Sequence, residues 1–579
     1  MTDNKKTPET GADLLRHLDD RDDLTKGRRR DLKSAIKRIC EMAHVVPTTL
    51  PADPMALRPI LRKIRPAAHG VSPKTWSNLK SLLGSALQLA GVADPMGAGL
   101  ALQSPDWKHL LVPIRENKRL SHGLAAFANW CAVEGIPPNA VGDETVQKFA
   151  AWIETRTLCP KPRDVIRRVP TLWNEANGAI AAWPRQQLTA ISFRGPRQRL
   201  SWEEFGESFR ADANAYLKMR AAPDIFEERP NAPKKPLAAN TVRVQSEHLR
   251  LAASVLVESG VPVEAITSLA VLVEAEHFKQ VLRHYHERAG GQPNAFAVCL
   301  AKTLIQAAYH HVAVSDDEVE RLKRIASNLP SIPLELTKKN KTLLRQLESE
   351  RLRAKLLFLP DQLISEATET LTAGRVDFVK AQVAVAIDIL LATPLRPQNL
   401  SRLNWARYFS EPDGPKGRTL LHIPKAETKS GQQDLDADIP DHVARKLRWY
   451  RRHILPCLNA DPNGDLFVTA NGNRKAQDTF TDQIILTIED RVGIHMTPHQ
   501  FRHFCGVSYL DENPKDMETV RALLGHASIK TTQIYVGPGS RRASRAYNAF
   551  VFEQREALKL KDKRRPSRNT NKKTKKEPA

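Results

Sequence analysis

Apolar residues recur at helical spacing along most of the first 330 residues, and the alternation typical of strands is rare there. One pattern occurs three times: an apolar stripe at intervals of three and four, a turn that ends at a proline, and a second helix. The stripes lie within residues 32–43, 124–131 and 249–256, and the prolines are Pro47, Pro137 and Pro262. Because proline cannot continue a helix, we expect three related helical domains in series, although this punctuation also arises by chance.

Proline-rich or glycine-rich stretches predict the boundaries between these units. They lie at residues 93–105, 223–236 and 329–341. At about 150 residues per domain, a chain of 579 residues is long enough for three to four domains. We expect a first helical domain over 1–100, a second, core-binding-like domain over 106–222, a core-binding domain over 235–330, a catalytic domain over 344–555, and a basic disordered tail over 556–579.

The pattern changes after about residue 344, where a short β section interrupts the helices. Residues 418–423 and 435–439 flank a polar Lys-Ser-Gly turn, which predicts an antiparallel hairpin. A long apolar helix is expected over 376–392, ending before Pro394. The fold class is therefore mainly α and multidomain, with a mixed α+β domain and a small antiparallel sheet near the C-terminus.

Charge points to a polyanionic partner. The net charge is +23, and residues 555–579, with 11 basic and 3 acidic residues, contribute +8, so the rest still carries +15. A basic body favours nucleic acid, although a solvated basic surface is the simpler alternative. The same alternatives apply to a cluster in the first domain, which we predict to bind DNA phosphates: Arg28, Arg29, Arg30, Lys33, Lys37 and Arg38.

The remaining composition excludes several classes of protein. Hydrophobic residues make up 41% and charged residues 26%, which is ordinary for a globular chain. No apolar stretch reaches the roughly 20 residues of a membrane helix, and the N-terminus lacks the apolar region of a secretory signal. The six cysteines are scattered, which makes a disulfide framework improbable and favours a reducing, cytoplasmic compartment.

The segment from Thr497 to Val536 carries the most informative chemistry. Pro498 suits a first helical turn, and His499, Arg502 and His503 then share one helix face. A second helix ends near Gly525, and Ser528 is a good N-cap for a third that carries Tyr535. An arginine fork pairs with two phosphate oxygens, histidine moves protons near neutral pH, and tyrosine is a covalent nucleophile.

Arg396, upstream of this segment, and the pair His499 and His503 within it carry further candidate chemistry. Arg396 is expected at the first turn of the helix after Pro394, where a helix N-terminus favours anions. His499 and His503, four residues apart, are alternatively zinc ligands, but Gln500 stands where the HExxH motif needs glutamate. We therefore expect neither a metal nor a cofactor, and give His503 a structural or secondary role.

With HQFRH and LLGHASIKTTQIY downstream of TPLRPQNLSRL, the chain resembles the tyrosine recombinase (phage integrase) family of site-specific DNA recombinases, over about residues 357–550. The family pattern is Arg, Lys in a hairpin, His-x-x-Arg, His or Trp, and Tyr. Position by position, the resemblance implies these catalytic residues: Arg396, Lys429, His499, Arg502, His526 and the nucleophile Tyr535. Lys425 is the alternative to Lys429.

Two positions depart from the family pattern. Pro394 replaces the usual glycine before Leu-Arg, and Asn399 replaces an acidic residue three positions after the first arginine. Asparagine still forms hydrogen bonds but lacks the charge, so these departures affect the surroundings of the site rather than its reaction.

The resemblance implies an enzyme that cleaves and rejoins double-stranded DNA through a 3′-phosphotyrosyl intermediate, for integration or excision of a mobile element. It further implies SAM-like helical domains that clamp the duplex. It implies a homotetramer in the synaptic complex, together with accessory recombination factors. The protein is expected in the bacterial cytoplasm, associated with the nucleoid, with no membrane partner. A type IB topoisomerase and a non-catalytic architectural DNA-binding protein are the alternatives.

Overall fold

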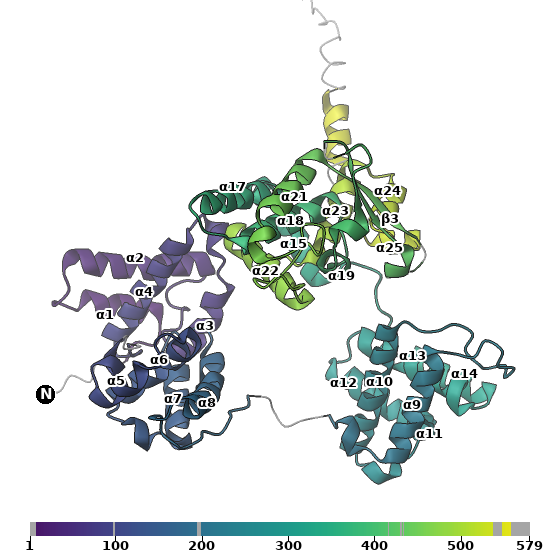
Figure 1. Ribbon diagram of the computed structural model, residues 1–579, viewed down its shortest axis with the longest axis horizontal. Coiled ribbons are helices and arrows are strands. Elements are labelled where there is room, and N and C mark those ends of the chain that lie inside the picture. The colour runs from purple at the N-terminus through teal and green to yellow at the C-terminus, as the bar shows by residue number, and fades with distance from the viewer. Residues whose placement is uncertain are drawn as a thin grey trace, which may run out of the picture. The chain divides into compact units, whose positions relative to one another are not determined.

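The computed structural model describes residues 7–95, 99–193, 199–414, 416–428, 431, 433–535 and 547–556. Within these residues the chain is mainly helical, with one small antiparallel sheet (Figure 1). Contacts divide it into two compact units: Met1–Gln187 together with Leu334–Ala579, and Leu188–Pro333. The expected mainly α, multidomain fold class is confirmed.

The N-terminal part of the first unit consists of helices that bury the apolar stripes identified in the sequence. Leu32, Ile36 and Ile39 lie on the buried face of α2 and pack with residues of α1 and α4. A bidentate ion pair from Arg156 to Asp94 joins the end of α7 to the segment after α4, with a shortest distance of 2.7 Å. The helices are α1 (Gly11–Asp19), α2 (Lys26–Ala43), α3 (Pro54–Lys63), α4 (Pro73–Leu89), α5 (Pro105–Leu111), α6 (Lys118–Val133), α7 (Asp143–Thr155) and α8 (Pro162–Ala179).

The recurring helix–turn pattern is present in the structure. α2, α6 and α10 (Ala239–Glu258) are each followed, within two residues, by a residue with positive φ and then by the predicted proline. Those residues are His44 (φ 54°), Gly135 (φ 68°) and Gly260 (φ 99°). The predicted helices and turns are thus confirmed, while a common origin of three domains stays a prediction.

The second unit, Leu188–Pro333, is a helical domain with its own core. Its helices are α9 (Glu207–Ala221), α10, α11 (Leu269–Val273), α12 (Ala275–Arg288), α13 (Ala295–Ala307) and α14 (Asp316–Ser327). Phe209 and Tyr216 of α9 belong to the same core as Leu249 of α10. α9 therefore lies with the third helical domain, whereas the expected boundaries at 222 and 235 assigned it to the second.

The proline-rich segment 223–236 explains this difference. It lacks helix and strand, as its prolines predict, but it is a loop inside the second unit rather than a linker between units. The Asn231 side chain donates to the Tyr309 carbonyl at 2.7 Å, and His310 Nδ1 lies 2.6 Å from the Asn231 carbonyl. Composition reveals an irregular segment but not the elements on which it packs.

The C-terminal domain, residues 334–535, is built around one buried helix, α18. Every residue from Ala381 to Leu390 is buried, and α18 packs against α17, α21, α22 and α23 (Figure 1). Asp388, the charged interruption of this apolar run, accepts an ion pair from Lys446 at 2.8 Å. The helices are α15 (Lys338–Leu347), α16 (Glu350–Leu357), α17 (Leu359–Thr372), α18 (Phe378–Ala392), α19 (Pro397–Ser401), α20 (Trp405–Tyr408), α21 (Asp441–His453), α22 (Gln477–Arg491), α23 (Pro498–Glu512), α24 (Met517–Leu523) and α25 (Ile529–Thr532).

The predicted hairpin is confirmed as β2 (Thr419–Ile423) paired antiparallel with β3 (Leu435–Ile439). Leu421 faces Ala437 across the pair, and Ile423 faces Leu435. A short strand that the sequence did not reveal, β1 (Phe409–Ser410), pairs with β2 and completes the order β1-β2-β3. After β2, Glu427 contacts Asn399 of α19 and Tyr408 of α20.

In the described part of the chain, no helix is both long and apolar enough to cross a membrane. Of the predicted tail, residues 557–579 lie outside the described residues, as does Lys429.

Candidate functional site

The site is organised by α23, whose start is fixed by its sequence. Thr497 is the N-cap, Pro498 occupies the first turn, and the Gln500 side chain accepts from the Thr497 backbone N–H at 2.9 Å. Three residues of this helix then project toward the site from one face, as predicted: His499, Arg502 and His503. His499 is exposed, whereas Arg502 and His503 are buried.

Arg502 joins three segments that are far apart in the sequence. The residue is 3% exposed, and its guanidinium donates from Nη1 to the Pro394 carbonyl at 2.7 Å and from Nη2 to the Leu524 carbonyl. Burial, together with the charge of Arg396, lowers the pKa of Arg502 to about 10. A guanidinium has five N–H donors, so two bonds to carbonyls leave donors for a ligand.

Arg396 stands at the junction of α18 and α19. It is the residue before Pro397, with extended backbone at the N-terminus of α19, and burial lowers its pKa. Among the described residues, none accepts a hydrogen bond from its guanidinium. The half-buried Arg396 and the buried Arg502 thus place two positive charges close together. Neither has a carboxylate partner among the described residues, and such a site favours a phosphate.

His526 follows Gly525, which ends the α24 segment with φ 55°. Its Nδ1 lies 3.0 Å from Thr532 Oγ1 of α25, and its ring stacks on that of Tyr535 with centroids 6.1 Å apart and planes within 14°. Burial and the charges of Arg502, Arg396 and Arg521 lower the pKa of His526 to about 4. The imidazole is therefore neutral at physiological pH.

Tyr535 lies in the 3₁₀ turn η9 (Gln533–Tyr535), directly after α25, which Ser528 caps as predicted. Its side chain is 5% exposed, and burial raises its pKa to about 12. The ring packs against Gly506 of α23, where an added Cβ would lie 3.0 Å from Tyr535 Cδ2. The Tyr535 hydroxyl lies 3.2 Å from His503 Nδ1.

The structure thus brings Arg396, Arg502, His526 and Tyr535 together, with His499 at the exposed edge of α23. Lys429 lies outside the described residues, but the turn around it is partly described. Lys425 begins a 3₁₀ turn (Lys425–Glu427) after β2, and Glu427 of this turn accepts hydrogen bonds from Arg407 and Tyr408. The choice between Lys429 and Lys425 stays a prediction.

Asn399, one of the two departures from the family pattern, has a clear contact. Its Nδ2 donates to the Glu427 backbone carbonyl at 3.1 Å, which fastens the hairpin turn to α19. The neutral side chain serves here because its partner is a carbonyl rather than a cation. Among the described residues, no group of three or more His, Cys, Asp or Glu side chains is arranged to hold a metal ion.

The structure adds contacts that sequence reasoning did not predict, including one by His503, for which the sequence predicted only a structural or secondary role. His503 contacts the tyrosine hydroxyl, Thr532 contacts His526, and Gly506 leaves room for the tyrosine ring. A histidine directly after the arginine was the available signal for His503, but its contact spans 32 residues of sequence.

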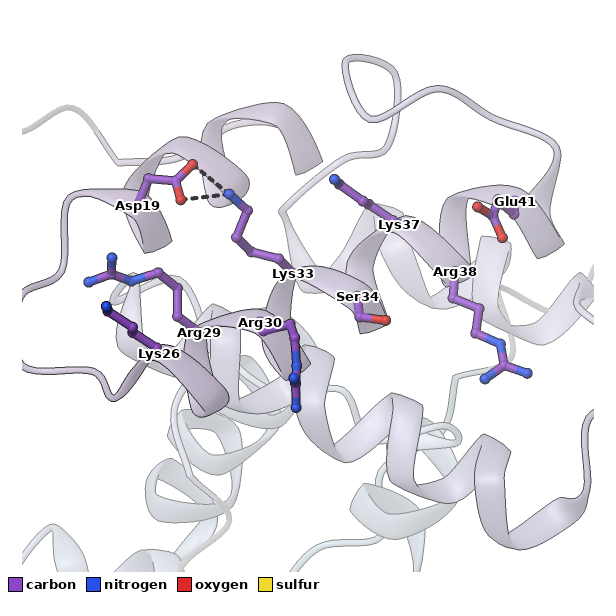
Figure 2. A pocket seen from close by; sticks show the side chains of 9 residues that line it. All are labelled: Asp19, Lys26, Arg29, Arg30, Lys33, Ser34, Lys37, Arg38 and Glu41. Carbon is purple, nitrogen blue, oxygen red and sulfur yellow. Dashed lines mark hydrogen bonds and ion pairs between the residues drawn. The ribbon is translucent and has the colours of Figure 1, made fainter.

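A separate cationic surface lies on α2 (Figure 2). It surrounds a hollow of about 570 Å³, and its cationic lining, called here the α2 basic face, consists of Lys26, Arg29, Arg30, Lys33, Lys37 and Arg38. Lys33 pairs with Asp19 at 2.6 Å, and Arg29 donates to the Arg21 carbonyl. Arg28 is exposed but does not line the hollow, so five of the six predicted residues gather here, and Lys26 joins them.

Comparison with known proteins shows what the part of the chain that carries this site is similar to. Residues 362–540 match the model of the phage integrase family. The tyrosine recombinase XerC of Pseudomonas fluorescens is 30% identical over 181 residues, which is 31% of this chain and 56% of that protein. The tyrosine recombinase XerD of Oceanobacillus iheyensis is 25% identical over 235 residues, 39% of this chain and 69% of that protein. The chain thus spans little more than half the length of the XerC relative.

Solved structures with a related chain include a lambda integrase tetramer bound to a Holliday junction, at 13% identity and a TM-score of 0.34 over 64% of this chain and 86% of that one. XerH bound to palindromic difH is 16% identical, with a TM-score of 0.36 over 54% of this chain and 80% of that one. TM-scores this low do not establish a shared arrangement. The family model and the curated relatives thus show that residues 362–540 are similar to the phage integrase family of tyrosine recombinases.

Proposed function

We propose that the chain is a site-specific DNA recombinase or integrase that breaks and rejoins DNA strands through a 3′-phosphotyrosyl intermediate. The observation that carries this proposal is the position of Tyr535 between His526 and His503, beside a pair of arginines with no carboxylate partner among the described residues. A tyrosine hydroxyl beside two desolvated guanidiniums suits attack on a phosphodiester, since the charge that develops is stabilised where it forms.

The reaction follows from these groups. Tyr535 Oη attacks phosphorus, the Oη–P bond forms, and the bond from phosphorus to the 5′-oxygen breaks. Arg396 and Arg502 stabilise the negative charge on the non-bridging oxygens, and His526 donates a hydrogen bond to the phosphate. Cationic side chains thus provide the electrostatic stabilisation.

Proton transfers complete the step. Lys429 protonates the leaving 5′-oxygen, so that a 5′-hydroxyl is released, and His499 assists proton transfer at the tyrosine. The phosphotyrosyl bond conserves the energy of the phosphodiester, and religation by a 5′-hydroxyl from another strand therefore needs no nucleotide hydrolysis.

The substrate in this proposal is double-stranded DNA, held by the C-terminal domain and by helical domains that precede it. Four copies assemble in the synaptic complex, together with accessory recombination factors, to integrate or excise a mobile element. We place this activity in the bacterial cytoplasm, at the nucleoid.

The α2 basic face is proposed as an additional contact to DNA phosphates. Lys26, Lys37 and Arg38 are exposed and line one hollow on α2 (Figure 2), while Asp19 and Glu41 limit its positive charge. Contacts of this kind add affinity without reading sequence. The basic segment 557–579 is proposed to act in the same way.

The direct test uses a suicide substrate, a nicked duplex whose cleaved fragment diffuses away and prevents religation. With DNA from the flanks of its own gene, the full chain is expected to form a covalent adduct. Tyr535→Phe removes one oxygen and keeps the ring, so it is expected to bind DNA normally and form no adduct. Tyr509→Phe is the matched control, because Tyr509 Oη donates to Asp516 instead.

An adduct at normal yield from Tyr535→Phe would place the nucleophile elsewhere. Relaxation of any supercoiled plasmid, without exchange between paired sites, would favour the topoisomerase alternative. Binding without an adduct from the wild-type chain would favour the architectural one.

A further inference from the structure

His503 is the side chain that contacts the reacting atom of Tyr535. Its Nδ1 lies 3.2 Å from the tyrosine hydroxyl, within hydrogen-bond distance, and the two ring centroids are 5.7 Å apart. Both side chains are buried, His503 to 9% exposure, so little water competes for this bond. His499, expected to assist the tyrosine, is exposed and lies one turn earlier on α23.

We propose that His503 is the general base of the cleavage step and accepts the phenolic proton at Nδ1 as Tyr535 attacks. The inference rests on the proposed recombinase function. As the Oη–P bond forms, the O–H bond of Tyr535 breaks and its proton passes to Nδ1. The bond to the 5′-oxygen breaks at the other side of phosphorus, and that oxygen takes its proton from a separate donor.

The surroundings keep His503 unprotonated before the reaction. The groups that face it are His499 and Arg502 from α23, His526 from the turn before α25, and Tyr535 from η9. Burial and the charges of His499, Arg502 and His526 lower the pKa of His503 to about 4. The imidazole is therefore neutral at physiological pH, and one ring nitrogen has a free lone pair.

Bound substrate is expected to raise the pKa of His503 and so to make it a stronger base. The phosphate places negative charge beside Arg396 and Arg502, and so offsets the positive charge that disfavours protonated His503. The base consequently gains strength only when the scissile phosphate is in place. The exposed His499 ring meets the His503 ring edge-on, with centroids 5.3 Å apart, so His503 lies one side chain away from solvent.

The test compares His503→Asn with wild type in single-turnover adduct formation on the suicide substrate. The amide oxygen of asparagine approximates the position of Nδ1, so it can still hold the hydroxyl but cannot take its proton. The rate at pH 7 is expected to fall by about 10²–10⁴. His495→Gln is the control, since His495 is exposed and bonds to Glu489 outside the site, and its rate should equal that of wild type.

The pH profile separates a base from a merely structural residue. Without a base only the phenolate reacts, and because the pKa of Tyr535 is about 12, the His503→Asn rate should rise about tenfold per pH unit from 7 to 9. The wild-type profile should be flatter. A structural defect would lower the rate equally at every pH. A substrate with sulfur at the 5′-bridging position, which needs no proton donor, should not rescue His503→Asn.

The outcomes separate this inference from the proposed function. A wild-type adduct with a His503→Asn rate within threefold of wild type, or with a pH-independent deficit, overturns the role of His503 alone. Absence of any wild-type adduct overturns both. If His503→Asn loses DNA binding or melts early, His503→Gln is measured in the same way, and its pH profile decides.

Discussion

The two cationic regions of this chain use the same residue types in opposite ways. Around Tyr535, Arg502 is buried, bonds to two backbone carbonyls, and has its pKa lowered by burial and by Arg396. On α2, Lys37 and Arg38 are exposed to solvent around an open hollow. A buried charge interacts strongly with a ligand and does so from a fixed position, which suits stabilisation of a transition state. An exposed charge is screened by water and salt, which suits exchange with counterions.

A substitution of Arg502 is expected to have the largest effect on this contrast between buried and exposed charges. Arg502→Lys keeps the positive charge but cannot serve two carbonyls and a phosphate at once. Adduct formation is expected to fall by about 10²–10³ or more, the range for loss of one charge-stabilising donor. The melting temperature should also fall, because a buried carbonyl without a donor costs about 1–3 kcal/mol. Retention of cleavage within tenfold would show that charge alone suffices and that geometry does not matter.

A substitution of Gly506 changes the space around the Tyr535 ring and leaves the charges of the site unchanged. An alanine Cβ there would lie 3.0 Å from Tyr535 Cδ2, so the ring must move by a few tenths of an ångström. Gly506→Ala is expected to lower the cleavage rate by about 10- to 100-fold, because a small misplacement of a reacting group costs that much. DNA affinity should not change. Gly178→Ala in α8, with open space around the new methyl group, is the control and should leave cleavage unchanged.

The smallest effect is expected on α2, where single charges act independently. Arg38→Gln should reduce the slope of log affinity against log salt by about 0.9, as expected for one lost phosphate contact. Arg28→Gln on the same helix removes an equal charge away from the hollow and should leave that slope nearly unchanged. Equal slopes for the two variants would mean that the α2 basic face is no binding surface but only a solvated one.

Local sequence signals predicted much of the site. Thr497 and Pro498 fix the start of α23, Ser528 caps α25, and the apolar alternation of residues 419–423 and 435–439 forms the hairpin. These features depend on neighbours within a few residues, and periodicity and capping rules describe such neighbours directly.

What sequence did not reveal depends on contacts between distant segments. The partnership of His503 with Tyr535 and that of Asn399 with the Glu427 carbonyl both arise only when the helices pack. The same holds for α9: the proline-rich loop after it led to a predicted domain boundary, but α9 packs in one core with the helices that follow the loop. The family pattern predicted which residues to expect in the site, whereas packing determined which atoms each of them contacts.

The pair of guanidiniums has a thermodynamic consequence for the free protein. Arg396 and Arg502 repel each other in a poorly solvated place, so the fold holds an unfavourable interaction that a bound phosphate would remove. By linkage, any ligand that binds only the folded chain stabilises it in proportion to the logarithm of its concentration. The stability of this C-terminal domain is thus coupled to the occupancy of its site, and a phosphate ligand bound there would raise the free energy of unfolding of the domain.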